Sequence, residues 1–183
     1  MAGLFLHICC GPCAAYPLEW LREHRPDLEL EGWFYNPNIQ PGGEFLRRRD
    51  SLAFLALNRG LTVDFSPPYD AADFLAALGP RPREPDRCRV CYAWRLSAVA
   101  REASRRGHRA FSTTLSFSKR QKHGLILEEG QRAAALHGLD FLYVDWRAGW
   151  RRGHELARGL GLYRQSYCGC LFSELEGLLP EGL

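Results

Sequence analysis

Seven cysteines are the residues of this chain whose type and spacing best suit chemistry. They fall into three groups: Cys9, Cys10 and Cys13; Cys88 and Cys91; Cys168 and Cys170. An odd number of cysteines rules out a complete set of internal disulfides. In a reducing compartment, cysteines at short spacing more often bind metals or take part in redox reactions than form structural bridges. The spacing therefore predicts a metal or redox site.

The first group directly follows an apolar run, Gly3–Ile8, that predicts a buried strand. Cys10 and Cys13 form a C-x-x-C pair, and Pro12 between them suits the first turn of a helix. Thiolates near a helix N-terminus are stabilised by the partial positive charge there. Cys9 is expected to point another way if the chain is extended at this point. The adjacent pair can then serve two metals or two edges of one site.

The other two groups are also spaced so that their sulfurs share a direction. Cys88 and Cys91 are three residues apart, which puts both on one face of a helix. Cys168 and Cys170 are two residues apart, which puts both on one side of an extended segment. Gly169 between them removes a side chain where a bulky cofactor can sit.

Several kinds of site agree with this spacing. A [4Fe–4S] cluster normally takes four cysteines, which leaves three for a further metal with an open position, or as redox-active or buried free thiols. The two C-x-x-C pairs also suit a tetrahedral Cys₄ zinc site. Thioredoxin-type chemistry needs only one C-x-x-C pair and leaves five cysteines without a role. The spacing indicates a metal but does not identify it.

The elements that must position these cysteines alternate between strands and helices. Strands are predicted at Gly3–Ile8, Leu28–Tyr35, Leu61–Phe65, Ala110–Thr114 and Phe141–Val144. Helices are predicted from the first cysteine group to about Arg22 and at Gly43–Asn58, Asp70–Leu78, Cys88–Arg106, His123–His137, Trp150–Leu160 and Leu171–Leu179. This alternation predicts a single α/β domain over residues 1–183, with helices on both faces of a parallel sheet. Such sheets bind ligands at the carboxyl ends of their strands.

The composition is that of a globular protein, with 46% hydrophobic and 25% charged residues in 183. No apolar run is long enough for a membrane span, and the first residues lack the features of a signal peptide. We therefore expect a cytoplasmic protein without a membrane partner. The net charge is +3, and Lys119 and Lys122 are the only lysines. Arginine suits phosphate contacts, although a GC-rich or heat-adapted genome gives the same bias.

Five motifs in this order resemble the QueH family of epoxyqueuosine reductases. They are His7-x-Cys9-Cys10-x-Pro12, Tyr35-Asn-Pro-Asn-Ile39, Cys88-x-x-Cys91, Thr113-Thr114-Leu115 and Tyr163-Arg-Gln-x-Tyr-Cys-Gly-Cys170. The resemblance runs from about His7 to Phe172. One C-x-x-C pair carries little information, whereas the adjacent Cys-Cys and the Tyr-Cys-Gly-Cys ending are uncommon.

The resemblance implies a Rossmann-like fold of the adenine-nucleotide-hydrolase type. It implies reduction of epoxyqueuosine to queuosine in the anticodon of tRNA, the last step of queuosine biosynthesis. It also implies a [4Fe–4S] cluster that supplies electrons, beside an additional mononuclear metal, expected to be iron, that activates the epoxide oxygen. The partners would be tRNA and an unidentified electron donor. No glycine-rich loop for ATP is present, so no nucleotide cofactor is expected.

All seven cysteines are metal ligands under this resemblance, with Cys13 at a position where the family can have aspartate. Which cysteines hold the cluster and which hold the other metal stays open. The candidate proton donors are His7, Tyr35, Asp70 and Tyr167, with Tyr92 as a further one. For Asp70, capping of a helix N-terminus is the alternative role.

Polar residues at the ends of the predicted strands and beside the last cysteines are candidate substrate contacts. They are Asn36, Asn38, Thr113, Thr114, Ser116, Arg164 and Gln165. Turn formation, helix capping and support of the metal ligands are the alternative roles for these residues.

Four basic groups are candidates for tRNA phosphate contacts, with solvent-exposed helical faces as the alternative. They are Arg47–Arg49; Arg81 with Arg83 and Arg87; Lys119, Arg120 and Lys122; and Arg151 with Arg152. Two other functions remain open on the sequence: a dithiol redox or sulfur-transfer enzyme that uses Cys10 and Cys13, and a zinc-stabilised RNA-binding module.

Overall fold

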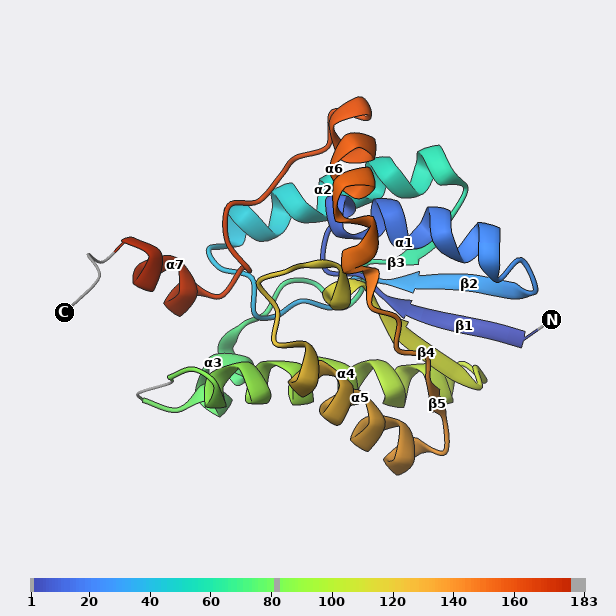
Figure 1. Cartoon of the computed structure of the whole chain (residues 1–183). Helices are drawn as coiled ribbons and strands as arrows, with labels where there is room; N and C mark the ends of the chain where they lie inside the picture. Colours follow the sequence, from blue (N-terminus) through green and yellow to red (C-terminus); the bar gives the residue numbers. More distant parts are fainter. Residues whose placement is uncertain (1, 81–82, 179–183) are drawn as a thin grey trace.

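A central sheet of five parallel strands organises the computed structural model, which describes residues 2–80 and 83–178 (Figure 1). The strands are β1 (Ala2–His7), β2 (Leu28–Trp33), β3 (Thr62–Asp64), β4 (Ala110–Thr113) and β5 (Asp140–Phe141). Their order is β3-β2-β1-β4-β5, and each neighbouring pair is parallel. The predicted parallel sheet is confirmed.

Helices cover both faces of this sheet, as predicted. Figure 1 shows α1 and α2 on one face and α4 and α5 on the other. The helices are α1 (Gly11–His24), α2 (Gly42–Arg59), α3 (Ala72–Leu78), α4 (Asp86–Arg105), α5 (His123–His137), α6 (Trp150–Gly159) and α7 (Leu171–Leu178), with two 3₁₀ turns, η1 (Thr114–Phe117) and η2 (Trp146–Gly149). No helix in the described part of the chain has the length and apolar character needed to cross a membrane.

The central strand explains why the layers pack in this way. Leu4, Phe5 and Leu6 of β1 are all fully buried, although neighbouring side chains of a strand point to opposite faces. A strand that is apolar on both faces requires cover on both, which is the usual condition of a parallel sheet. From β1, the chain adds β2 and then β3 on one side of the sheet, and it later adds β4 and β5 on the opposite side of β1. This reversal of strand order opens a crevice at the carboxyl ends of β1 and β4.

Most predicted boundaries differ from the structure by one or two residues, and the last strand differs by more. The last strand was expected at Phe141–Val144 but ends at Phe141, because the amide of Tyr143 bonds to the carbonyl of Phe141 (3.0 Å) in a tight turn. The helix expected to start at Cys88 starts at Asp86, after Pro85. Position 179, the predicted end of the last helix, lies outside the described residues.

Helix α6 packs closely because it carries glycine where it meets the core. A Cβ atom at Gly153 would lie 2.4 Å from the ring of Phe117. Phe117 is buried, and its ring stacks on Trp150 at a centroid distance of 5.3 Å. The ring therefore has little room to move. This close packing places the segment after α6, which carries Cys168 and Cys170, over the carboxyl edge of the sheet (Figure 1).

We predict that Gly153→Ala destabilises the protein by about 1–3 kcal/mol, the usual cost of overpacking a core. Gly159→Ala in the same helix is the matched control, because a Cβ there has no atom within 4 Å. It should be neutral or stabilising by up to about 1 kcal/mol. Urea unfolding followed by circular dichroism measures both, and equal stabilities would contradict the packing described.

Candidate functional site

Three cysteine sulfurs meet where β1 runs into α1. The sulfurs of Cys9, Cys10 and Cys13, the thiol triad, all lie within 4.8 Å of one another and are buried. Cys10 precedes the helix with an extended backbone, and Pro12 occupies the first turn of α1, as predicted. The expectation that Cys9 points another way is wrong: its sulfur is 3.9 Å from that of Cys10.

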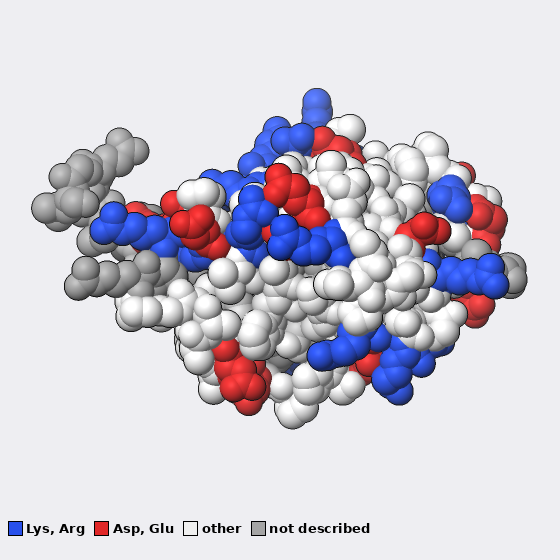
Figure 2. All heavy atoms as spheres, turned by 90° about the horizontal axis from the view of Figure 1, so that it is seen from below, with Lys and Arg blue, Asp and Glu red and all other residues white. Residues whose placement is uncertain are grey.

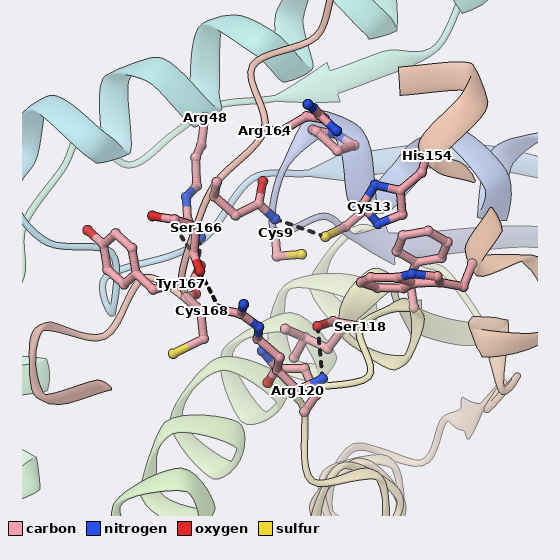
Figure 3. Close-up of a pocket in the computed structure, with 16 residues that line it drawn as sticks. Cys9, Cys13, Arg48, Ser118, Arg120, His154, Arg164, Ser166, Tyr167 and Cys168 are labelled. Carbon is pink, nitrogen blue, oxygen red and sulfur yellow. Dashed lines mark hydrogen bonds between the residues drawn. The ribbon is translucent and has the colours of Figure 1, made fainter. Parts of the chain in front are cut away.

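Two distant segments support the thiol triad. Thr114 Oγ1 accepts a hydrogen bond from the amide of Cys9 (3.1 Å) and lies 3.4 Å from its sulfur. Gln165 Nε2 donates to the sulfurs of Cys10 (3.0 Å) and Cys13 (3.3 Å); the bond to Cys13 is drawn in Figure 3. Two predicted substrate contacts, Thr114 and Gln165, thus lie against thiols, and the residues after β4 and after α6 join the site.

The three thiols of the triad have pKa values that are shifted in different directions. Hydrogen bonds from Cys10, Cys13 and Thr114 lower the pKa of the Cys9 thiol. Burial raises the pKa of Cys10, and its neighbouring sulfurs raise the pKa of Cys13. The surroundings therefore favour the thiolate of Cys9 over those of Cys10 and Cys13. A metal ion bound here would favour the thiolate form of all three.

The other four cysteines line a cavity between the start of α4 and the segment before α7, and Cys168 also lines the cavity beside the triad. They are Cys88, Cys91, Cys168 and Cys170, the thiol tetrad. Burial raises the pKa of Cys88 to about 12 and that of Cys91 to about 11. Figure 3 shows the sulfur of Cys168 pointing away from those of Cys9 and Cys13. The structure thus brings all seven cysteines to one edge of the sheet but divides them into three and four.

Buried polar atoms around the tetrad point to a group that completes it. Asn38 is 2% exposed and lines this cavity, and its Oδ1 has no hydrogen-bond partner among the described residues. Arg95 is 3% exposed, lines the same cavity and has an Nε without a partner there. Its charge lowers the pKa of Cys91 against the effect of burial. A cationic side chain and four thiols fit an anionic metal–sulfur group.

Arg48 attaches the last cysteine group to the body of the protein. Its side chain is 2% exposed and pairs with Glu44 at 2.7 Å. The guanidinium also donates to the carbonyls of Tyr167 and Cys168, both at 3.0 Å, and lies 5.3 Å from the ring centroid of Tyr167. Arg48 was predicted as a candidate phosphate contact on an exposed helix. The structure instead makes it a buried anchor.

Gly169 is required here for a reason other than the predicted one. Its φ is +109°, a conformation that side chains rarely adopt, and a Cβ would lie 3.0 Å from both Arg48 and Ile39. The glycine therefore permits close packing of the chain against Arg48. The room for a cofactor that the sequence suggested is not what this position supplies.

A cavity of about 170 Å³ opens beside the thiol triad (Figure 3). Phe117, Trp150 and His154 form an aromatic wall, with 4.3 Å between the ring centroids of the last two. Lys119 Nζ lies 5.5 Å from the Trp150 ring, and Arg164 lines the opening. Aromatic rings beside basic groups suit an unpaired base and its phosphate. The sequence reasoning missed Trp150 and His154, which carry no local signal.

The four candidate proton donors lie in different surroundings. Tyr167 lines the cavity beside the triad and donates its hydroxyl to the carbonyl of Gln40. His7 is fully buried and bonds to Thr113 (2.8 Å) and the carbonyl of Tyr35 (3.1 Å). Burial and the charge of Arg95 lower the pKa of His7 to about 4. Its imidazole is therefore neutral near pH 7 and connects the ends of three strands.

Tyr35 and Asp70 line another cavity on the side of β2 and β3, and Tyr92 lines that of the tetrad. Asp70 is exposed and accepts a hydrogen bond from the amide of Ala72 (2.9 Å), the first residue of α3. The N-cap of this helix is Ala71, so Asp70 supports the helix start from one residue before the cap position. Asn36 is buried between the carbonyl of Ile8 (2.9 Å) and Arg95 (3.2 Å). These residues are thus not gathered around the triad.

Two hydroxyl residues, one at the end of β4 and one just after it, hydrogen-bond to the local backbone. Thr113 Oγ1 accepts from the amide of Leu115 (3.2 Å), and Ser116 donates to the carbonyl of Thr113 (3.3 Å). Both are buried. Their contacts agree with the capping alternative, while Ser118 and Arg164 remain at the wall of the cavity.

Most of the basic groups are paired with acids. Arg87 pairs with Glu84 and Glu176, and Lys122 pairs with Glu84 at 2.7 Å. Figure 2 shows basic and acidic side chains side by side on the face that carries α4 and α5. Arg152 pairs with Glu19 at 2.8 Å on another face. Position 81 lies outside the described residues.

Comparison with known proteins gives a consistent result. Residues 4–176 match the family model described as "Epoxyqueuosine reductase QueH". Proteins of that name from Thermotoga maritima and Dehalococcoides mccartyi are 34% and 32% identical to this chain. These alignments cover 96% and 94% of the chain and 92% and 93% of the two relatives. A protein of the same name from Acinetobacter baylyi is 33% identical, over 93% of the chain and 79% of that relative.

We predict that Arg48→Met lowers the free energy of unfolding by about 1.5–3 kcal/mol, because the buried carbonyls of Tyr167 and Cys168 lose their charged donor. Glu44 keeps its pair with Arg47 at 2.8 Å. Arg49→Met is the matched control on the next residue, whose side chain is 41% exposed and pairs with Asp50. The control should change stability by no more than about 0.5 kcal/mol. Urea unfolding of both variants checks this, and a small effect of Arg48→Met would exclude Arg48 as an anchor.

Proposed function

The chain belongs to the QueH family of epoxyqueuosine reductases, and we propose that it reduces epoxyqueuosine to queuosine in the anticodon of tRNA. The observation that carries this proposal is the thiol triad at the wall of a cavity with aromatic and basic sides. Such a cavity suits an unpaired modified base, and the thiols suit a metal beside it.

We further propose that the tetrad holds the [4Fe–4S] cluster and that the triad holds a mononuclear iron. A cluster takes four cysteines and has four corners, so its ligands lie farther apart than those of a single ion. The triad, with all sulfurs within 4.8 Å, suits a single ion with an open position. This division uses all seven cysteines. It speaks against a zinc site built from the two C-x-x-C pairs, because Cys10 and Cys13 belong to the triad whereas Cys88 and Cys91 line the cavity of the tetrad.

The reaction converts an epoxide to an alkene and releases its oxygen as water, which consumes two electrons and two protons. When bound, the cluster would supply electrons singly and the additional ion would draw charge from the epoxide oxygen. Gln165 would orient the substrate, because its Nε2 is held by two sulfurs while its Oε1 lacks a partner among the described residues. Gln165 lines the cavity, and its buried Oε1 would accept a hydrogen bond from a substrate hydroxyl that enters there.

Tyr167 is the residue we propose as the proton donor to the departing oxygen. Of His7, Tyr35, Asp70 and Tyr167, only Tyr167 lines the cavity beside the triad. Its hydroxyl donates to the Gln40 carbonyl in this structure and would exchange that hydrogen bond for one to the departing oxygen. The Arg48 guanidinium near its ring, 5.3 Å from the centroid, holds it in place. The neutral, enclosed His7 would keep the strand ends in position rather than touch substrate.

The remaining parts of the proposal concern the whole protein. Residues 1–183 would form one metalloenzyme domain, because thiols from the first, middle and last parts of the chain would serve one centre. The enzyme would act in the cytoplasm, where its tRNA substrate is, with an electron donor still to be identified. Neither a nucleotide cofactor nor a membrane enters the proposed reaction.

Metal analysis of variants tests the proposed ligand sets. After anaerobic reconstitution, the wild type should contain about five irons and about four sulfides, the content of a [4Fe–4S] cluster plus one ion. Cys91→Ala and Cys168→Ala should lose the sulfide and the activity. Cys13→Ala should keep about four sulfides and lose about one iron.

Zinc without sulfide would reject this proposal in favour of a structural zinc protein. Activity that survives complete removal of iron would support the dithiol enzyme instead. Full activity of Cys91→Ala or Cys168→Ala would exclude the proposed cluster ligands.

The activity itself is tested by incubating the reduced protein with tRNA that contains epoxyqueuosine and measuring queuosine by mass. Tyr167→Phe should lower kcat by about 10²–10⁴-fold, the usual contribution of a general acid, with unchanged iron and sulfide. Tyr143→Phe is the control, because that hydroxyl bonds to His123 (2.8 Å) outside the cavity. Equal kcat values for the two variants would remove Tyr167 from the mechanism.

A further inference from the structure

A buried arginine in the middle of α4 has no acidic partner among the residues that the structure describes. Arg95 is 3% exposed, and its Nη1 donates to Asn36 Oδ1 (3.2 Å). Its Nε has no hydrogen-bond partner in the described chain. A charge at this depth is costly unless an opposite charge balances it. The fold therefore holds a positive charge that a bound anionic group would balance.

Arg95 belongs to the cavity of the thiol tetrad. It follows Cys91 by one helical turn, so the two side chains share a face of α4, and both line this cavity. The charge of Arg95 lowers the pKa of the Cys91 thiol against the effect of burial. The guanidinium and the proposed cluster ligands thus face the same space.

Asn36 holds the guanidinium in one orientation before any cofactor binds. Its Nδ2 donates to the carbonyl of Ile8 (2.9 Å), just after β1. The side-chain oxygen of Asn36 is therefore the atom that faces Arg95 and accepts from it. A cation fixed in this way loses little conformational entropy when an anion binds beside it.

The other charges at this cavity leave Arg95 unbalanced. Glu84 is the acidic side chain in the described part of its lining, and it pairs with Lys122 (2.7 Å) and Arg87 (3.1 Å) instead. Arg120 lines the cavity as a further cation. Three arginines thus stand against one glutamate in the described lining. Of these arginines, Arg95 is the buried one whose charge no described acid compensates.

The tetrad reaches charge balance with Arg95 when it holds a metal–sulfur group. Burial raises the pKa of Cys88 and Cys91, so without a metal these thiols keep their protons and carry no charge to offset the arginine. A [4Fe–4S] cluster on four thiolates is anionic and gains a further negative charge when it is reduced. A fixed cation beside it stabilises the reduced form more than the oxidised form.

We propose that Arg95 is the counter-charge of the cluster and that its fixed positive charge raises the reduction potential of the cluster. This proposal rests on the proposed function for the presence of the cluster. One electron would pass from the donor, which is oxidised, to the cluster, which is reduced. Arg95 would stabilise the added charge without taking up a proton, because a guanidinium keeps its charge throughout. Two such transfers would supply the electrons that the epoxide consumes.

Redox titration of the reconstituted protein, followed by EPR of the reduced cluster, tests this role without turnover. Arg95→Gln removes the charge and keeps an N–H donor for Asn36. It should make the cluster at least about tenfold harder to reduce, which is about 59 mV in midpoint potential for a one-electron couple. Arg95→Lys keeps the charge, and its equilibrium constant for reduction should stay within about threefold of the wild type.

Arg101→Gln is the matched control, because Arg101 is an exposed arginine on the same helix. Water and salt screen a charge there, so the midpoint potential should not change. Iron and sulfide are measured in every variant, so that potentials are compared between proteins with a full cluster. Loss of sulfide from Arg95→Gln with full content in Arg95→Lys would also support the proposal, since the charge would then decide whether the cluster is held.

An unchanged midpoint potential in Arg95→Gln would overturn the proposal. An equal fall in Arg95→Gln and Arg95→Lys, or loss of sulfide from both, would also overturn it, because the shape of the arginine and not its charge would then matter. If the potentials change as expected but epoxyqueuosine tRNA is not converted, the proposed reaction fails and Arg95 keeps its role. A wild type without sulfide would reject the cluster and this role together.

Discussion

The candidate centre depends on one buried contact, that of Arg48 with the backbone of Tyr167 and Cys168. The guanidinium is neutralised by Glu44 and donates to two successive carbonyls 119 and 120 residues away in sequence. A charge at this depth is costly unless it is paired and its donors are used. The segment that carries the last two cysteines is the partner that uses them. Together with the hydrogen bonds of Gln40 to Gly169 (2.8 Å) and Leu171 (3.1 Å), this contact holds half of the tetrad's sulfurs in place.

The strand order determines where the groups meet. Because β1 has β2 on one side and β4 on the other, the residues that follow β1 and β4 face each other across the crevice. Cys9 and Thr114 occupy these two positions and are hydrogen-bonded. The segment after α6 then closes over the crevice through Gln165. A parallel sheet thus brings three distant parts of the chain together at one edge.

The sequence could predict what depends on local spacing and could not predict what depends on partners far along the chain. The alternation of strands and helices, Pro12 in the first turn of α1 and the gathering of cysteines all follow from short patterns. Arg48 and Glu44 are four residues apart, which looks the same in sequence as a solvated surface pair. The Arg48 side chain is buried because the carbonyls of Tyr167 and Cys168 accept its hydrogen bonds. The cavity beside the triad likewise combines side chains from separate segments, so no local pattern marks it.

If the protein acts on tRNA as proposed, the charges at this edge of the sheet would orient the RNA strand. Arg120 and Arg164 line the cavity of the triad, whereas Asp70 and Asp73 line the cavity at the ends of β2 and β3. Phosphates are attracted to the first side and repelled from the second. A strand can therefore place its backbone beside the triad cavity and away from the two carboxylates. A strand laid in the reverse direction would bring phosphate to the carboxylates, so the same charges that attract the RNA also exclude its wrong orientation.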